Sequence, residues 1–159
     1  MIVADSSPLI GLAVIGQLDA LRIVSTRVLA PQAVWAEIMA KGGVLPGARE
    51  VGACKWIEVL AVDANRVAPL IPLVEEGEAE AIVLAQTVPA STLLIDEKKG
   101  RRLAKRMQVP LIGTIGILQK AKSVGAIPKL RPCLDQLRAH GMYLKQDFVN
   151  SVLRSVGEA

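Results

Sequence analysis

Two short apolar segments of this chain end on a carboxylate, a placement that suits chemistry. Asp5 follows the run 2–4, and Asp96 follows the run 93–95. If these runs are neighbouring parallel strands, both carboxylates lie at the same edge of a sheet. That edge, outside the carboxyl ends of the strands, is where open α/β sheets bind their ligands.

Two predicted helices could bring further carboxylates to this edge. Glu37 lies in segment 31–41 among apolar neighbours, where an unpaired charge would be costly. In segment 77–87, Glu80 points toward the apolar side of the helix. Glu78 lies in the first turn, where an acid complements the helix dipole without any catalytic role. Glu80 is therefore the stronger candidate, and Glu78 remains an alternative.

Three or four carboxylates without a histidine partner have the composition of a Mg²⁺ or Mn²⁺ site. Such an ion can polarise a phosphodiester and activate the attacking water. Its charge would also explain how several acids are tolerated close together. The candidate metal ligands and catalytic residues are Asp5, Glu37, Asp96 and either Glu80 or Glu78. The candidate supporting residues are Ser6, Ser7, Glu78, Glu97 and Thr114.

Several supporting residues also have an ordinary structural interpretation. Ser6 or Ser7 is expected to cap the helix that follows the first strand. Strand alternation turns Glu97 away from the face occupied by Asp96. Thr114 could cap the next helix, or it could hydrogen-bond a metal-bound water or a phosphate.

Other chemistries fit the sequence less well. A Ser-His-Asp triad would depend on His140, the only histidine, which is predicted at a helix end. Zinc lacks suitable ligands, and no glycine-rich phosphate-binding loop follows the first strand. A phosphatase of the haloacid-dehalogenase type would need a second aspartate at Ser7. A phosphoacceptor receiver domain fits equally poorly.

The chain has a formal net charge of +4, and its basic residues are concentrated in one segment. Segment 98–131 contains ten Lys and Arg residues and no acid. Such a block is either a solvated helix face or an electrostatic footprint for phosphates. The candidate phosphate contacts in this block are Lys98, Lys99, Arg101, Arg102, Lys105 and Arg106.

Strands that alternate with helices predict a parallel sheet covered on both faces. We expect strands at 2–4, 28–30, 56–60 (an edge strand), 93–95 and 109–113. Helices are expected at 8–21 (one helix, or two that break near Gly16), 31–41, 46–53, 77–87, 98–107, 115–124, 130–140 and 145–156, with an interrupted helix at 63–75.

Composition indicates a cytoplasmic protein that does not enter a membrane. No run reaches the roughly 18 apolar residues of a membrane span. No basic region precedes the first apolar run, as it would in a signal peptide. Cys54 and Cys133 are isolated and are expected to be free, buried thiols.

Four segments resemble the successive motifs of PIN-domain proteins, in the same order and at similar spacing. They are Asp-Ser-Ser-Pro-Leu-Ile (5–10), Pro-Gln-Ala-Val-Trp-Ala-Glu-Ile (31–38), Gly-Glu-Ala-Glu-Ala-Ile (77–82) and Leu-Ile-Asp-Glu (94–97). Segment 110–118 and the C-terminal helices resemble a prokaryotic subgroup related to VapC toxins.

The resemblance implies a three-layer α/β/α sandwich with a mainly parallel sheet. Residues 1–159 would form one PIN-like domain, with C-terminal helices from about residue 130. It implies a Mg²⁺- or Mn²⁺-dependent ribonuclease whose four acids are Asp5, Glu37, Glu80 and Asp96. Glu78 competes with Glu80 for the third position, and Asp96-Glu97 offers two acids for the fourth.

Members of the toxin class usually act as homodimers and are inhibited by a small antitoxin protein. The expected function is therefore an RNA-cleaving toxin of a toxin–antitoxin pair, with the cations of segment 98–106 predicted to bind the RNA backbone. The alternative is a catalytically inactive PIN fold that binds RNA or a protein.

Overall fold

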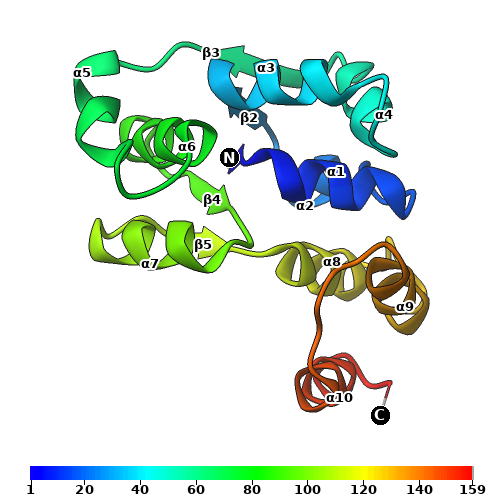
Figure 1. Ribbon diagram of the computed structural model, residues 1–159. Coiled ribbons are helices and arrows are strands. Elements are labelled where there is room, and N and C mark those ends of the chain that lie inside the picture. Colours follow the sequence, from blue (N-terminus) through cyan, green and yellow to red (C-terminus); the bar gives the residue numbers. More distant parts are fainter. Residues whose placement is uncertain (159) are drawn as a thin grey trace.

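The structure, a computed structural model, describes residues 1–158 and has a five-stranded parallel sheet (Figure 1). The strands are β1 (Ile2–Ala4), β2 (Val28–Pro31), β3 (Ile57–Leu60), β4 (Thr92–Leu94) and β5 (Leu111–Ile112). Their order is β3-β2-β1-β4-β5, and every neighbouring pair is parallel. The strand that leads into Asp5 is therefore the central one.

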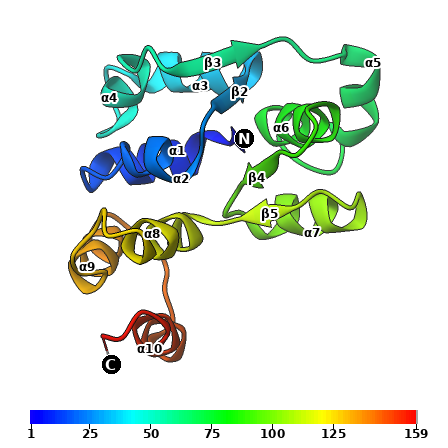
Figure 2. The ribbon, with the colours of Figure 1, turned by 180° about the vertical axis from the view of Figure 1, so that it is seen from behind.

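Helices cover both faces of the sheet, as the back view also shows (Figure 2). They are α1 (Ser6–Val14), α2 (Ala20–Val24), α3 (Gln32–Lys41), α4 (Ala48–Gly52), α5 (Ala64–Val67), the 3₁₀ helix η1 (Ala68–Leu70), α6 (Glu76–Thr87), α7 (Lys98–Arg106), α8 (Thr114–Ser123), α9 (Arg131–Ala139) and α10 (Gln146–Ser155). Within residues 1–158, none of these helices has the length and apolar character that a membrane crossing requires.

Alternating strand residues divide the interior into two cores. Ile2 and Ala4 of β1 face the core that contains residues of α1, α2, α3, α4, α8, α9 and α10. Val3, between them, faces the core built with α5, η1, α6 and α7. This period-two division is what a strand buried on both faces requires. The predicted three-layer α/β/α architecture is confirmed.

Backbone pairing continues past the strands and brings their carboxyl ends to one edge. The Asp5 N–H donates to the Leu94 carbonyl at 3.0 Å. On the other side of β4, the Ile95 N–H donates to the Ile112 carbonyl at 3.0 Å. Asp5, Asp96 and the start of α8 therefore follow three adjacent strands at the same edge.

Two predicted helix caps are wrong. Helix α1 begins at Ser6, with Asp5 in an extended conformation at its N-cap, so neither Ser6 nor Ser7 is the cap. The tight turn leaves no spacer residue, because the Asp5 N–H is still paired with β4. Helix α8 begins at Thr114, and its N-cap is Gly113.

The remaining differences are small. Segment 63–75 forms only α5 and η1, because prolines interrupt it as expected. Strand β5 is shorter than the predicted 109–113. Both cysteines are free, but Cys54 is only half-buried because it lies just after the short helix α4.

The C-terminal helix α10 lies at the end of the molecule farthest from β3 (Figures 1 and 2). Val149, Val152 and Leu153 bury its inner face in the first core. The carboxylate of Glu158 then accepts hydrogen bonds from Lys122 Nζ and from the Leu130 and Arg131 N–H groups. This cluster ties the end of the described chain to α8 and to the start of α9.

Candidate active site

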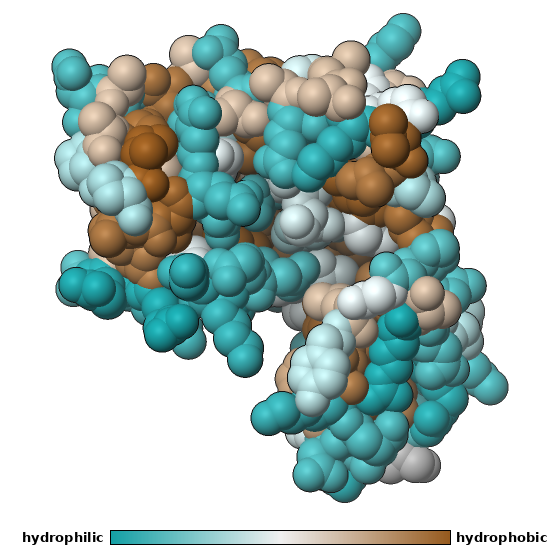
Figure 3. Space-filling model, in the orientation of Figure 1, coloured by the Kyte–Doolittle hydropathy of each residue, from teal (hydrophilic) through white to brown (hydrophobic). Residues whose placement is uncertain are grey.

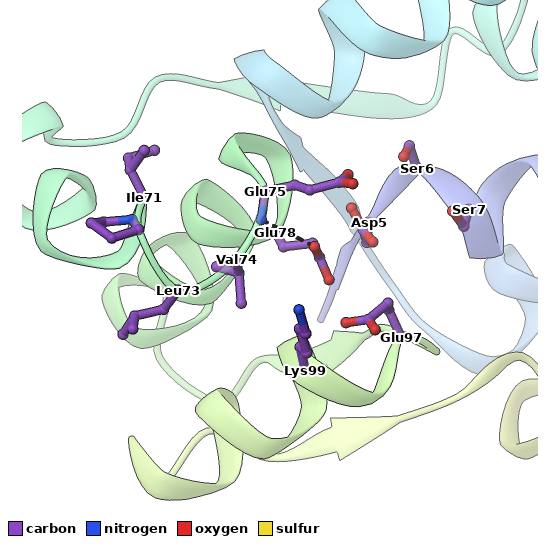
Figure 4. Close-up of a pocket in the computed structure, with 11 residues that line it drawn as sticks. Asp5, Ser6, Ser7, Ile71, Leu73, Val74, Glu75, Glu78, Glu97 and Lys99 are labelled. Carbon is purple, nitrogen blue, oxygen red and sulfur yellow. Dashed lines mark hydrogen bonds between the residues drawn. The ribbon is translucent and has the colours of Figure 1, made fainter.

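A hollow of about 450 Å³ opens at the carboxyl edge of the sheet (Figure 4). It lies between the β1–α1 junction, the loop before α6, and the first turn of α7. Its lining combines acids, hydroxyls, one lysine and apolar residues: Asp5, Ser6, Ser7, Ile71, Pro72, Leu73, Val74, Glu75, Glu78, Glu97 and Lys99. We call this the acidic hollow.

Asp5 forms the inner wall of the acidic hollow and is only 5% exposed. Burial raises its pKa from 3.8 to about 6, the Ser6 backbone opposes part of this shift, and the carboxylates of Glu37, Glu75 and Asp96 add to it. A carboxylate with such a pKa is still mostly ionised at neutral pH. Its charge is therefore present in a place where a cation would stabilise it.

Glu78 is 6% exposed, and its two carboxylate oxygens have different surroundings. Oε1 accepts the Glu75 N–H at 3.2 Å, as part of a capping box at the start of α6. Oε2 is buried and has no hydrogen-bond partner within residues 1–158. Burial is the largest effect and raises the Glu78 pKa to about 7. The hydrogen bond from the Glu75 N–H opposes this shift, and the charge of Asp5 adds to it. The hollow therefore contains a second destabilised carboxylate.

A glycine in α7 makes this placement of Glu78 possible. A Cβ at Gly100 would lie 2.6 Å from Glu78 Oε2 and 2.5 Å from Ile95 Cδ1. The glycine leaves room for the carboxylate against the first turn of α7. Sequence reasoning missed Gly100, although a glycine inside an otherwise basic helix was a signal that something approaches closely there.

Glu37 lies beside Asp5 but is engaged on both oxygens. Oε2 accepts the Ser6 hydroxyl at 3.0 Å, and Oε1 accepts Lys41 Nζ at 2.6 Å. Ser6 is buried and its hydroxyl orients the Glu37 carboxylate, while its supporting role in the chemistry stays a prediction. Direct ligation of an ion by Glu37 would require an exchange of one of these partners.

Asp96 points to the other side of the edge, toward α8. Its Oδ1 accepts the Thr114 N–H at 2.9 Å, and its Oδ2 accepts the Thr114 hydroxyl at 2.6 Å. A Cβ at Gly113 would lie 2.9 Å from Oδ1, so a glycine is again needed beside the acid. Thr114 does not cap α8 but holds Asp96, and its contact to a metal-bound water or a phosphate stays a prediction.

Asp96 also borders a second hollow that is more apolar than the first. We call it the α1–α9 groove; it is lined by Ser7, Ile10, Gly11, Val14, Lys41, Leu45, Pro46, Asp96, Thr114, Leu137, His140, Gly141 and Met142. Ser7 is the one hydroxyl that borders both hollows. Strand alternation does separate Asp96 from Glu97, but Glu97 is the one that faces the acidic hollow.

The structure does not bring Glu80 into either hollow. Its Oε1 accepts the Ala33 N–H at 3.0 Å, which satisfies a free donor in the first turn of α3. Glu78 instead shares the acidic hollow with Asp5 (Figure 4). Glu80 was predicted on the apolar side of α6, and part of that side packs against α3. A side chain that points inward from α6 therefore need not point toward the sheet edge.

The acids of the hollow fit a hard divalent cation in charge and donor type. All are oxygen donors, two are buried, and one buried oxygen is unpartnered. As they stand, residues 1–158 contain no group of three or more His, Cys, Asp or Glu side chains that could hold an ion. Mg²⁺ commonly binds through one or two carboxylates and completes its shell with water and substrate phosphate. The pair Asp5 and Glu78 meets that requirement.

Helix α7 presents a basic surface next to the acidic hollow. Its exposed cations are Lys98, Lys99, Lys105, Arg102 and Arg106. Arg101 differs, because it is half-buried and donates to the Ile95 carbonyl at 2.7 Å. Arg101 therefore braces the end of β4, while the role of α7 in RNA binding stays a prediction.

Comparison with known proteins agrees with this arrangement. The chain matches none of the curated proteins. A family model described as PIN domain matches residues 1–158, which is nearly the whole chain. PIN domains are generally metal-dependent nucleases. With its parallel sheet and its acids gathered at the carboxyl edge, the chain belongs to the PIN-domain family.

Proposed function

We propose that this protein is a Mg²⁺- or Mn²⁺-dependent endoribonuclease that hydrolyses phosphodiester bonds of RNA. The observation that carries the proposal is the pairing of buried Asp5 with Glu78, whose Oε2 is buried without a partner among residues 1–158. Two such carboxylates in one hollow destabilise a protein unless a cation is bound. The family membership, which indicates a nuclease, supports the same conclusion.

In this proposal, Asp5 and Glu78 would hold the ion in the acidic hollow. The ion, when bound, supplies charge neutralisation and polarisation of the phosphodiester. Glu37, oriented by Ser6, and Asp96, oriented by Thr114, lie at the same sheet edge and would help to orient the attacking water. The exposed cations of α7 hold the RNA backbone, which gives affinity without sequence recognition.

The biological role that we propose is that of a toxin inhibited by a partner protein. The α1–α9 groove supports it, because an apolar groove beside Asp96 offers a segment of an antitoxin a place from which to block the site. At its rim, Leu45 lies 40% exposed in the loop that follows α3, which adds an apolar contact for such a segment.

One observation favours the rival function, a non-catalytic PIN fold that binds RNA or a protein. Lys41 and Ser6 occupy both oxygens of Glu37, and Thr114 occupies both oxygens of Asp96. If those contacts persist in the presence of an ion, neither Glu37 nor Asp96 can coordinate it, and only the acids that line the acidic hollow remain as ligands. The two functions make different predictions for metal binding and cleavage.

Cleavage of a fluorescent single-stranded RNA in Mg²⁺, together with calorimetric Mg²⁺ titration, tests the proposal. We expect Asp5→Asn and Glu78→Gln to lose cleavage by at least about a hundredfold and to weaken Mg²⁺ binding. Glu80→Gln is the matched control on the same helix and should change the rate less than about tenfold, since glutamine can still accept the Ala33 N–H. RNA binding without Mg²⁺ binding or cleavage in the native protein would favour the rival.

A further inference from the structure

One wall of the acidic hollow is apolar and exposed, which the metal site does not explain. Ile71 is 44% exposed and Leu73 is 55% exposed, with Pro72 between them. All three line the acidic hollow together with Asp5 and Glu78. We call these three residues the apolar shelf. In the space-filling view, apolar surface gathers around α5, η1 and the following loop, directly beside the hydrophilic surface of α7 (Figure 3).

The apolar shelf is held in place by its own segment. Leu70 and Val74, on either side of it, are buried in the second core. The N–H groups of Leu73 and Val74 donate to the Leu70 carbonyl at 2.9 and 3.1 Å. Pro72 further restricts the backbone. Ile71 and Leu73 thus lie on a turn that is already ordered. Binding of a ligand to them therefore costs little conformational entropy of this segment.

Charge decides which part of a ligand can lie on the apolar shelf. Glu75, Glu78 and Asp5 stand next to it, so a phosphate placed there would be repelled. The cations lie on the opposite side, along α7, and Lys99 extends from that helix into the hollow (Figure 4). A strand with an anionic backbone and flat, neutral side groups fits this division: its backbone follows α7 and a side group covers the shelf.

We infer that the apolar shelf is a nucleobase subsite for an unpaired nucleotide next to the scissile phosphate. This inference rests on the proposed function and adds to it the residues, Ile71 and Leu73, that one base of the substrate contacts. A base in a duplex is covered on both faces by its neighbours and cannot pack on Ile71 and Leu73. An unstacked base can, and such packing tolerates any sequence because every base has an apolar face.

The test uses Ile71→Ser/Leu73→Ser in the full-length protein, with Ile23→Ser/Val124→Ser as the matched exposed apolar control. Binding is measured by fluorescence anisotropy in an Asp5→Asn background, which prevents cleavage. Two labelled RNAs of equal length and charge serve as probes, one with all its bases and one abasic throughout. Cleavage of a single-stranded and a double-stranded RNA is measured in the native background.

We expect the shelf variant to bind the base-containing RNA about fivefold or more weakly and the abasic RNA unchanged. The control variant should bind both as before, and duplex RNA should be cleaved much more slowly than single strands. If the native protein cleaves RNA but the shelf variant binds both probes like the control, the subsite is overturned and the nuclease stands. If the native protein neither binds nor cleaves RNA, the proposed function fails and the subsite with it. A shelf variant that turns a dimer into a monomer with unchanged RNA affinity would overturn the subsite and assign the shelf to a second copy.

Discussion

Thr114 makes two hydrogen bonds to one carboxylate, that of Asp96, 18 positions earlier in the chain. Its backbone N–H lies 2.9 Å from Oδ1, and its hydroxyl lies 2.6 Å from Oδ2. Thr114 is only 1% exposed, so water does not compete for either bond. The first turn of α8 therefore fixes the direction in which Asp96 faces the sheet edge.

Replacing Thr114 with valine should slow cleavage while keeping the fold. Valine has nearly the same shape and keeps the N–H contact, so only the hydroxyl bond is lost. A hydrogen bond to a charged group contributes roughly 1.5–3 kcal/mol, which corresponds to about a ten- to hundredfold loss in kcat/KM if Asp96 is mispositioned. Thr114→Ser keeps the hydroxyl and is the control. Equal rates for the valine and serine variants would contradict a positioning role.

Removing the charge of Asp5 should stabilise the metal-free protein while abolishing its activity. A pKa raised from 3.8 to about 6 means that the ionised form costs the fold roughly 3 kcal/mol at neutral pH. Asp5→Asn removes that cost, so urea unfolding in EDTA should show a more stable variant at pH 7. Glu78→Gln should act in the same direction, since its pKa is also raised.

The pH dependence of this effect has a definite sign. A group whose pKa is higher in the folded state binds more protons when folded, so its cost appears as pH rises from about 4 to about 6 and is constant above. The stability gap between Asp5→Asn and the native chain should therefore close below about pH 4. Adding Mg²⁺ at pH 7 should narrow the gap by stabilising only the native chain. A gap that does not depend on pH would point to packing instead of charge.

Neutralising the outer end of α7 should weaken RNA binding in a salt-dependent way. Each phosphate contact that is lost should lower the slope of log affinity against log salt by about 0.7 for a single strand. Lys105→Gln/Arg106→Gln is the test pair, and Arg49→Gln/Lys55→Gln removes the same charge from exposed positions elsewhere. The two pairs should differ in slope and in affinity. Identical slopes would contradict a contact between the RNA backbone and this end of α7.

The Glu158 cluster should stabilise the C-terminal part of the fold. Although burial opposes it, hydrogen bonds from Lys122 and from the Leu130 and Arg131 N–H groups lower the pKa of Glu158 to about 2. Glu158→Gln should cost about 1–3 kcal/mol in urea unfolding at pH 7. A lowered pKa gives stability that is present above about pH 4.5 and is lost as pH falls toward 2, so the variant and the native chain should converge in acid. Exposed Glu50→Gln is the control.

Much of the fold was predictable because the strands are short, apolar and bounded by clear signals. The runs that end at Asp5 and Asp96 proved to be neighbours, β1 and β4, as a parallel sheet with both acids at one edge requires. Residues 56–60 alternate in polarity, and β3 is indeed the edge strand. The interrupted segment 63–75 was predictable from its prolines.

The details of the site were harder, because they depend on side-chain conformation. Glu78 and Glu80 are two positions apart on one helix and so point in very different directions. Sequence alone could not say which direction is the sheet edge, since α6 also packs on α3. The capping box of Glu75 and Glu78 was readable from spacing, but the spacing did not show that Glu78 Oε2 is buried against Gly100 without a partner among residues 1–158. The pairing of Asp96 with Thr114 spans a strand and could not be inferred.

The central position of β1 has a consequence for how the chain acquires activity during synthesis. Its first neighbour, β2, begins at Val28, but its second, β4, begins only at Thr92. The site around Asp5 therefore cannot assemble until Glu78, Asp96 and Thr114 have been synthesised and have left the ribosome. At about 5–20 residues per second, that interval is several seconds, and any chain that is cut short before Thr114 lacks the complete site. A ribonuclease of the proposed kind is thus made, beside its own messenger, in a form that stays inactive until most of it has been synthesised.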